Sequence, residues 1–312
     1  MATILITGGT GLIGKALTKA LLEKNYKVVV LSRGINSQQT ETTNLSFAQW
    51  DINSQQIDKA AVESADYIIH LAGAGVADKR WTTKRKKEIV DSRVKGSELI
   101  VKALQEIPNN IKAVISASAI GWYGADPVIP NPKPFREDDP NDNDFLGETC
   151  KLWEESLQPI GKMGKRLIKL RTGIVLSNEG GALKEFKNPL RFGVATILGN
   201  GKQIISWIHI DDLVRLYMAA IKDQNMNGVY NAVAPAPVSN KGLTLQIARV
   251  QKGNFFIPVH VPSFVLKMVL GEMSIEVLKS ATVSCDKVHY GGFIFLYPGI
   301  EAALANLKQT LQ

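Results

Sequence analysis

The stretch TGGTGLIG at residues 7–14 constrains the fold of this chain more than any other. It follows a short apolar run and precedes an amphipathic stretch at residues 14–24. Gly8, Gly11 and Gly14 have the spacing that lets a strand turn sharply into a helix and bring its backbone close to a phosphate. The N-terminus of that helix presents free N–H groups and the positive end of its dipole. The stretch therefore predicts a dinucleotide site formed by Gly8, Thr10, Gly11, Leu12, Ile13 and Gly14.

Apolar runs alternate with stretches of helical period along the first half of the chain. Strands are expected at residues 3–7, 27–32, 67–73, 112–118 and 166–177, and helices at 14–24, 84–106 and from 144 onward. Continuous apolar strands that alternate with helices predict an α/β fold with a doubly wound parallel sheet of Rossmann type. We expect residues 1–177 to form this domain. Residues 178–312 would form a smaller α/β substrate lobe, with residues 211–231 returning to the Rossmann sheet.

Composition limits where the chain works and what it binds. No apolar run approaches the ~18–20 residues of a membrane span. The first strand begins almost at Met1, which leaves no room for a leader. Two cysteines among 312 residues indicate a reducing, cytoplasmic setting. The lack of a long apolar run indicates that the chain does not enter a membrane. The net charge of +8 suits an anionic cofactor or substrate as well as nucleic acid. No nucleic-acid module is recognisable, so we expect none to be bound.

The end of the second expected strand indicates which dinucleotide is bound. NAD-binding chains carry an acidic residue there for the ribose 2′-OH. This chain has Ser32 and Arg33 instead, and an arginine can stack on adenine and pair with a 2′-phosphate. These residues favour NADP. Asp51, at the end of the next strand, either meets the adenine amino group or stabilises a turn.

Residues 125–144 interrupt the alternation with five prolines and an acidic end. A loop of this length inside a compact domain is usually functional. We expect it to lie over the carboxyl ends of the strands, where open α/β sheets bind ligands, and to act as a lid.

The motifs together resemble the extended short-chain dehydrogenases/reductases, and more closely one subfamily of them. These motifs are HLAGAG (70–75), SASAIGWYG (116–124), CKLWEE (150–155), LRTGIVLS (170–177), SWIHIDDL (206–213) and LGEMS (270–274). That subfamily comprises epimerase-like, NADP-binding proteins with a C-terminal domain of unknown function. Its members carry descriptions such as nucleoside-diphosphate-sugar epimerase or cell-division inhibitor, and neither description fixes a reaction.

The resemblance also implies individual cofactor contacts. Ser32 and Arg33 match the pair that holds the 2′-phosphate, and Arg93 replaces an asparagine beside the nicotinamide ribose. The remaining positions that it implies are Leu71, Ala72, Gly73, Glu88, Ser116 and Ile174.

The catalytic residues that the resemblance leads one to expect are missing. Ordinary members use a Tyr as acid–base, a Lys four residues later that lowers its pKa, and a Ser that orients the substrate. When Glu154 is aligned with the acid of that helix, the Tyr and Lys positions hold Leu146 and Cys150. Lys151 cannot replace Cys150, because one residue turns a helix by about 100°.

A relocated catalytic set is one explanation. Ser118 matches the serine of the family, Tyr123 follows it by five residues, and Arg93 would supply the charge of the missing lysine. Tyr123 could equally form only a wall of the pocket. Cys150 is expected to be a buried, inert thiol.

Other polar features give weaker indications. The four histidines lack metal-ligand spacing, so no metal site is expected. The basic run KRWTTKRKK (79–87) is interpreted first as a solvated face and then as a site for an anionic substrate.

Two classes of function therefore stay open. One is an NADP-dependent oxidoreductase or epimerase acting on a small carbonyl or nucleotide-sugar-like substrate. The other is a non-catalytic NADP-binding sensor or regulator. A monomer or a homodimer would suit either.

Overall fold

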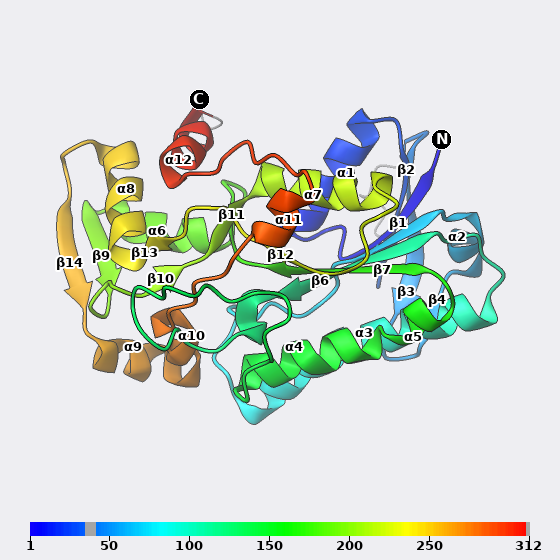
Figure 1. Cartoon of the computed structure of the whole chain (residues 1–312), viewed down its shortest axis with the longest axis horizontal. Coiled ribbons are helices and arrows are strands. Elements are labelled where there is room, and N and C mark those ends of the chain that lie inside the picture. Colours follow the sequence, from blue (N-terminus) through cyan, green and yellow to red (C-terminus); the bar gives the residue numbers. More distant parts are fainter. Residues whose placement is uncertain (35–41, 310–312) are drawn as a thin grey trace.

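The computed structural model describes residues 1–34 and 42–309. A central sheet is built from β1 (Thr3–Thr7), β2 (Lys27–Ser32), β3 (Leu45–Asp51), β4 (Gln56–Ile57), β5 (Tyr67–His70), β6 (Ala113–Ala119), β7 (Arg166–Thr172) and β12 (Gly228–Ala232). The strand order is β12-β7-β6-β5-β1-β2-β3-β4, with β4 alone antiparallel to its neighbour (Figure 1). This is the predicted Rossmann sheet, and the prediction of fold class is confirmed. Although distant in sequence, β12 pairs with β7 at the edge of this sheet.

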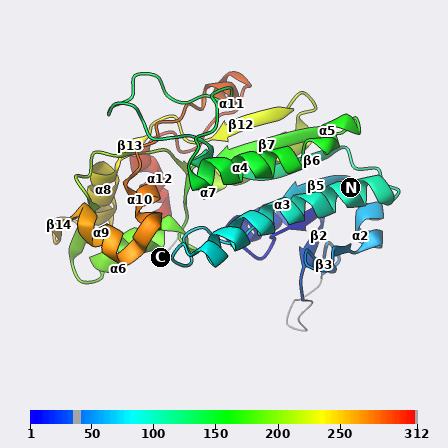
Figure 2. The same ribbon diagram turned by 90° about the horizontal axis from the view of Figure 1, so that it is seen from below.

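Helices cover both faces of the sheet, which explains why its strands are apolar without alternation. One face carries α1 (Leu12–Glu23), α7 (Ile210–Lys222) and α11 (Asp286–Tyr290). The other carries α2 (Lys59–Ser64), α3 (Thr83–Glu106), α4 (Phe145–Ser156) and α5 (Pro159–Lys162). In β1, Ile4 and Ile6 point to the first face and Leu5 to the second, all fully buried. Helices α3 and α4 run side by side along the second face (Figure 2).

The prediction of one strand at residues 166–177 is wrong in one respect, because these residues form two strands. Strand β7 ends before Gly173. The next strand, β8 (Ile174–Leu176), pairs instead with β11 (Trp207–His209). A side chain at Gly173 would overlap the Ser206 carbonyl, 2.6 Å from the position of its Cβ. The close approach of these two backbones therefore ends the strand.

The C-terminal lobe lies beyond the carboxyl edge of the sheet, at the left of Figure 1. Its helices are α6 (Ala182–Leu190), α8 (Asn240–Lys252), α9 (Ser263–Leu270), α10 (Ser274–Leu278) and α12 (Ile300–Gln309). Its strand pairs are β9 (Val194–Leu198) with β14 (Ile257–Val261) and β10 (Ile204–Ile205) with β13 (Val238–Ser239). Helices α6, α8 and α12 enclose a separate apolar core around Trp207 and Leu243. In the described part of the chain, no helix combines the length and apolarity needed to cross a membrane.

Residues 125–144, the predicted lid, are fastened to the C-terminal lobe. The Asp126 carboxylate accepts hydrogen bonds from Ser280, from Asn131, and from the hydroxyl and N–H of Thr282. Farther along, Phe135 forms a backbone bridge with Val283. The loop is thus held by residues that follow it by about 150 positions, a length of chain over which sequence pattern gives no guidance.

Candidate functional site

The glycine loop has the geometry that its spacing predicts. Gly8 has a φ of +70°, and a side chain there would lie 2.8 Å from the Leu71 carbonyl carbon. A methyl group on Gly14 would overlap the Gly8 carbonyl oxygen. Gly11 caps α1 without any side-chain hydrogen bond, and within the described residues the first N–H groups of α1 have no partner. The loop therefore offers an anion site at the start of α1. Thr10, Leu12 and Ile13 lie within this turn, and Leu12 also contacts Gly181, which precedes α6.

A buried histidine beneath the glycine loop was missed as a site-forming residue. The Thr7 hydroxyl and His70 Nδ1 are 2.7 Å apart, and the same hydroxyl oxygen accepts the N–H groups of Leu71 and Ala72. Burial lowers the pKa of His70 to about 3, so the ring is neutral. Thr7 and His70 hold the ends of β1 and β5 together and fix the turn at Leu71 and Ala72, two predicted cofactor contacts. The contact between Thr7 and His70 follows from the pairing of β1 with β5. A single sequence does not reveal which strands pair, so this contact could not be predicted.

The end of β2 carries the cation that is predicted to bind a phosphate. Arg33 is exposed, and Ser32 donates its hydroxyl hydrogen to the Gly34 carbonyl. Asp51 accepts hydrogen bonds from the Asn53 N–H and the Ser54 hydroxyl, and these bonds lower its pKa. The role of Asp51 in a turn is therefore visible, and its contact with adenine stays a prediction.

Arg93, on α3, packs against the turn that follows β5. Its guanidinium lies against Gly73, and Nη1 donates to the carbonyls of Ala74 and Ile89. Its central carbon is 5.1 Å from the ring centroid of Trp153 on α4. Burial lowers the pKa of Arg93. Among the described residues, Nε and Nη2 have no hydrogen-bond partner, so part of this cation is available to a ligand.

Helix α4 presents the three residues that the alignment placed on one face. Leu146 and Cys150 both pack on Gly121, and the Cys150 thiol is 3.7 Å from the Ala119 carbonyl oxygen. Burial raises the pKa of Cys150 to about 12, as expected for an inert thiol. Glu154, one turn on, reaches Ser118. Helix α4 therefore has an apolar residue and a buried thiol at the two positions that the resemblance aligns with the Tyr and Lys of ordinary members.

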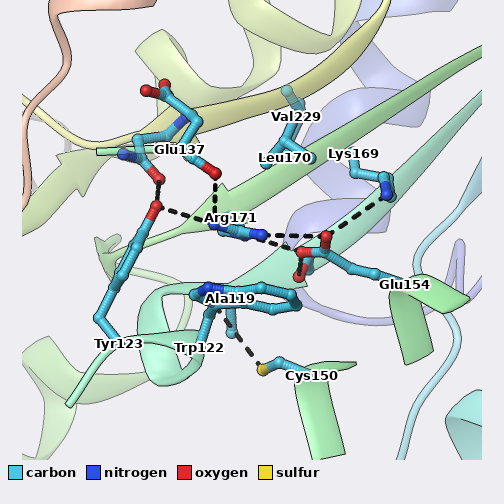
Figure 3. Close-up of polar contacts among 12 residues, drawn as sticks. Ala119, Trp122, Tyr123, Glu137, Cys150, Glu154, Lys169, Leu170, Arg171 and Val229 are labelled. Atoms are coloured by element: carbon cyan, nitrogen blue, oxygen red, sulfur yellow. Dashed lines mark hydrogen bonds and ion pairs between the residues drawn. The ribbon is translucent and has the colours of Figure 1, made fainter. Parts of the chain in front are cut away.

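The prediction that Tyr123 is the relocated acid–base conflicts with its position. Its side chain is fully buried and its ring stacks on Phe135, 5.2 Å between centroids. Its hydroxyl donates to Asn231 Oδ1 at 2.7 Å and accepts from Arg171 at 3.0 Å (Figure 3). Burial raises the pKa of Tyr123 to about 12, the wrong direction for proton transfer at neutral pH. The enclosed hydroxyl and its two protein partners favour the alternative that Tyr123 only forms a wall of the site, and its catalytic role stays a prediction.

Ser118 belongs to a buried ionic network. Its hydroxyl donates to Glu154 Oε1 at 2.7 Å, and the same carboxylate accepts from Nε and Nη2 of Arg171 (Figure 3). Lys169 Nζ lies 3.4 Å from Glu154 Oε2. Arg171 also lies 3.6 Å above the ring centroid of Trp122. The hydroxyl hydrogen of Ser118 is therefore directed to a carboxylate, and Arg171 links this carboxylate to the Tyr123 hydroxyl.

The other predicted contacts are dispersed along the cleft. Ser116 is buried and donates to the Ala117 carbonyl, whereas Ile174 is 39% exposed at the start of β8. Glu88 pairs with Arg85 at 2.8 Å, which explains its side chain without a cofactor. These three positions remain predictions.

The interpretation of the basic run as a solvated face is wrong for part of it. Arg85 is buried and donates to the Gly75 carbonyl, and Lys86 pairs with Glu272 of the C-terminal lobe. Arg80 contacts Gly271 in the same lobe. The run therefore attaches the start of α3 to the residues between α9 and α10.

The C-terminal lobe also places a lysine beside the start of α4. Lys279 Nζ is 2.9 Å from both Asp144 Oδ2 and Glu276 Oε1. Burial raises the pKa of Glu276, and the two carboxylates keep the pKa of Lys279 above its ordinary value despite burial. Asp144 is the N-cap of α4, so this cluster stands next to Leu146. Among the described residues, no group of three His, Cys, Asp or Glu side chains is arranged for a metal.

Comparison with known proteins agrees with this geometry. Residues 4–147 match the NAD dependent epimerase/dehydratase family, and residues 261–307 match a domain of unknown function, DUF1731. The epimerase family protein YfhF of Bacillus subtilis is 35% identical over 305 residues, which are 97% of each chain. SSP1921 of Staphylococcus saprophyticus is 34% identical over 98% of this chain and 99% of its own. The crystal structure of human epimerase family protein SDR39U1 with NADPH has a TM-score of 0.86 at 27% identity, covering 98% of this chain and 99% of that one.

Proposed function

Because this chain belongs to the epimerase family, we propose that it binds NADPH at the carboxyl edge of its sheet and acts through that binding, without the proton transfer that Tyr and Lys perform in ordinary members. The bound dinucleotide would supply a hydride donor. The residues of the chain would hold it: the free N–H groups of α1 at the pyrophosphate, Arg33 at the 2′-phosphate and Arg93 beside the ribose.

The register of α4 is the observation that carries this proposal. Leu146 cannot exchange a proton, and Cys150 is a buried thiol whose pKa is raised to about 12. Two candidates are already engaged by protein groups, since Tyr123 is enclosed and Ser118 donates to Glu154. An NADPH-binding site with these neighbours supports a sensor or regulator of the nucleotide. The NADPH bound to the human relative is consistent with Arg33 as a phosphate ligand here.

Calorimetric titration of NADPH and NADH into wild type and Arg33→Ala tests the proposal. We expect wild type to prefer NADPH. Arg33→Ala should weaken NADPH binding by roughly tenfold or more, since a charge-assisted contact is worth about 1.5–3 kcal/mol, and should change NADH binding little. Arg191→Ala, at an exposed arginine that caps the end of α6, is the matched control. Equal losses for the two nucleotides would refute the role of Arg33, and failure of both to bind wild type would refute the proposal.

The free nitrogens of Arg93 favour one second candidate, an NADPH-dependent reductase. Arg93 would hold the oxygen of a small carbonyl substrate and stabilise the negative charge that forms there, while water donates the proton. A panel of aldehydes, ketones and nucleotide sugars, followed by loss of NADPH absorbance, separates the candidates. Turnover that Arg93→Met abolishes and Arg93→Lys partly keeps would favour the reductase. No turnover in wild type with tight NADPH binding would favour the sensor.

A further inference from the structure

A cavity lies beside α7, near the C-terminal end of α1. It occupies about 810 Å³ between the outer face of α7, β12 and the chain around α11. Lys24, at its rim, ends α1, whereas the phosphate loop begins the same helix. The 12 residues of α1 span roughly 18 Å at about 1.5 Å per residue, so the two sites are separate. The volume is within the range of about 300–1,000 Å³ that is typical of small-molecule sites.

Cations surround this cavity. Lys24, Arg215, Lys222 and Lys287 line it, against a single carboxylate, Asp223. Lys287 Nζ donates to the Val229 carbonyl and lies 4.4 Å from the centroid of the Tyr230 ring, so its ammonium is held in place. Among the described residues, the side-chain ammonium groups of Lys24 and Lys222 have no hydrogen-bond or ion-pair partner.

The local charge is close to one positive unit. Buried Asp212 pairs with Arg215 at 3.0 Å and neutralises it. Asp223 offsets one lysine, and the C-terminal ends of α1 and α7 contribute about half a negative charge each. The three lysines carry three positive charges, and Asp223 and the two helix ends together offset about two of them, which leaves roughly one positive charge. The cavity therefore suits a monoanion better than a triphosphate or a polyanion.

The walls of the cavity are apolar. Met218 and Ala219 of α7 are half-buried there, and the rings of Tyr230 and Phe293 stand on the opposite side. Asp212 fixes the chain that carries Phe293, because its carboxylate accepts the N–H groups of Leu296 and Tyr297. Ile294 at the rim is 75% exposed.

We propose that this cavity is a binding site for an organic monoanion, a carboxylate or sulfonate joined to an aromatic or aliphatic body. The acid group would lie at Lys222 and Lys287, and the apolar body would lie along Met218, Ala219 and Phe293. Neither the nucleotide cleft nor the proposed function requires this site.

Fluorescence titration with 8-anilinonaphthalene-1-sulfonate tests the proposal, because this probe is an aromatic monoanion. The titration is made with the full chain at saturating NADPH, which keeps the probe out of the nucleotide site. It is repeated without nucleotide, so that the outcome does not depend on the proposed function. We expect one bound probe per chain. Lys222→Glu with Lys287→Glu should weaken it roughly tenfold. Lys162→Glu, also an exposed lysine in the last turn of a helix, is the matched control.

A neutral probe separates the charge of the site from its apolar walls. N-phenyl-1-naphthylamine has the same rings without the sulfonate, so the lysine reversals should leave its affinity unchanged. Ala219→Trp, which narrows the cavity, should weaken both probes, with thermal unfolding as the check on folding. Absence of sulfonate binding in wild type, or equal affinity in wild type and the double lysine variant, would overturn the proposal.

Discussion

At the scale of the residue, Glu154 determines how the centre of this site is held. Its carboxylate accepts from Ser118 and Arg171 and lies near Lys169, while its own exposure is 4%. Glu154→Gln would keep the shape and remove the charge. Because this leaves Arg171 without its counter-ion, we expect the free energy of unfolding to fall by about 3 kcal/mol. Urea denaturation followed by circular dichroism measures the change.

The neighbouring residue gives a matched control for this change. Glu155 is on the same helix and is exposed, so Glu155→Gln should change stability by less than about 0.5 kcal/mol. If the two variants lost the same stability, the buried network would not be a source of stability. Nucleotide affinity should fall little in either variant, because Glu154 reaches the cleft only through Ser118.

Residue roles were harder to predict than residue positions. Leu146, Cys150 and Glu154 were placed correctly because the period of a helix fixes which residues share a face. The enclosure of the Tyr123 hydroxyl was not foreseen, because its acceptor is Asn231, which lies 108 residues later on β12. A sequence read strand by strand gives no sign that this asparagine reaches the tyrosine hydroxyl.

At the scale of the element, the turn from β1 into α1 was predictable because its constraints are local. The glycines allow a backbone that other residues would obstruct. Gly14→Ala would push a methyl group into the Gly8 carbonyl. We expect this change to abolish detectable NADPH binding and to cost about 1–3 kcal/mol of stability, since the turn cannot relax without moving β1. Calorimetry and urea denaturation measure the two effects.

Another helical glycine serves as the comparison. A Cβ at Gly161 of α5 would meet no atom within 4 Å. Gly161→Ala should therefore leave binding unchanged and stabilise the chain by up to about 1 kcal/mol. Normal NADPH binding by Gly14→Ala would contradict the close packing of the loop.

Longer-range features of the elements were not accessible in the same way. The break at Gly173 arises from the Ser206 carbonyl on another part of the chain. The expected alternation of strands and helices was correct because each unit carries its own apolar period. The interruption was missed because it needs a partner from the C-terminal half.

At the scale of the whole molecule, the C-terminal segment contacts the loop at residues 125–144 and holds it in place. Lys279 reaches Asp144 at the start of α4, and Arg136 pairs with Asp286. Asp126 makes the densest of these connections, with two oxygens that accept from Asn131, Ser280 and Thr282. A loop held at several points in this way is expected to act as a fixed wall, in contrast to the lid that its length and prolines indicated.

Removing the central connection distinguishes a fixed wall from a lid. Asp126→Ala leaves the Thr282 N–H and two hydroxyls without their acceptor, so we expect a loss of about 2–3 kcal/mol in the free energy of unfolding. Asp138→Ala, at an exposed position of the same loop, should change it by less than about 0.5 kcal/mol. Hydrogen exchange followed by mass spectrometry should show faster exchange in Asp126→Ala at residues 125–144 and 280–284 together, because the backbone bridge between Phe135 and Val283 joins these segments. Faster exchange confined to residues 125–144 would mean that the loop moves independently of the C-terminal lobe, and the fixed wall would be the wrong description.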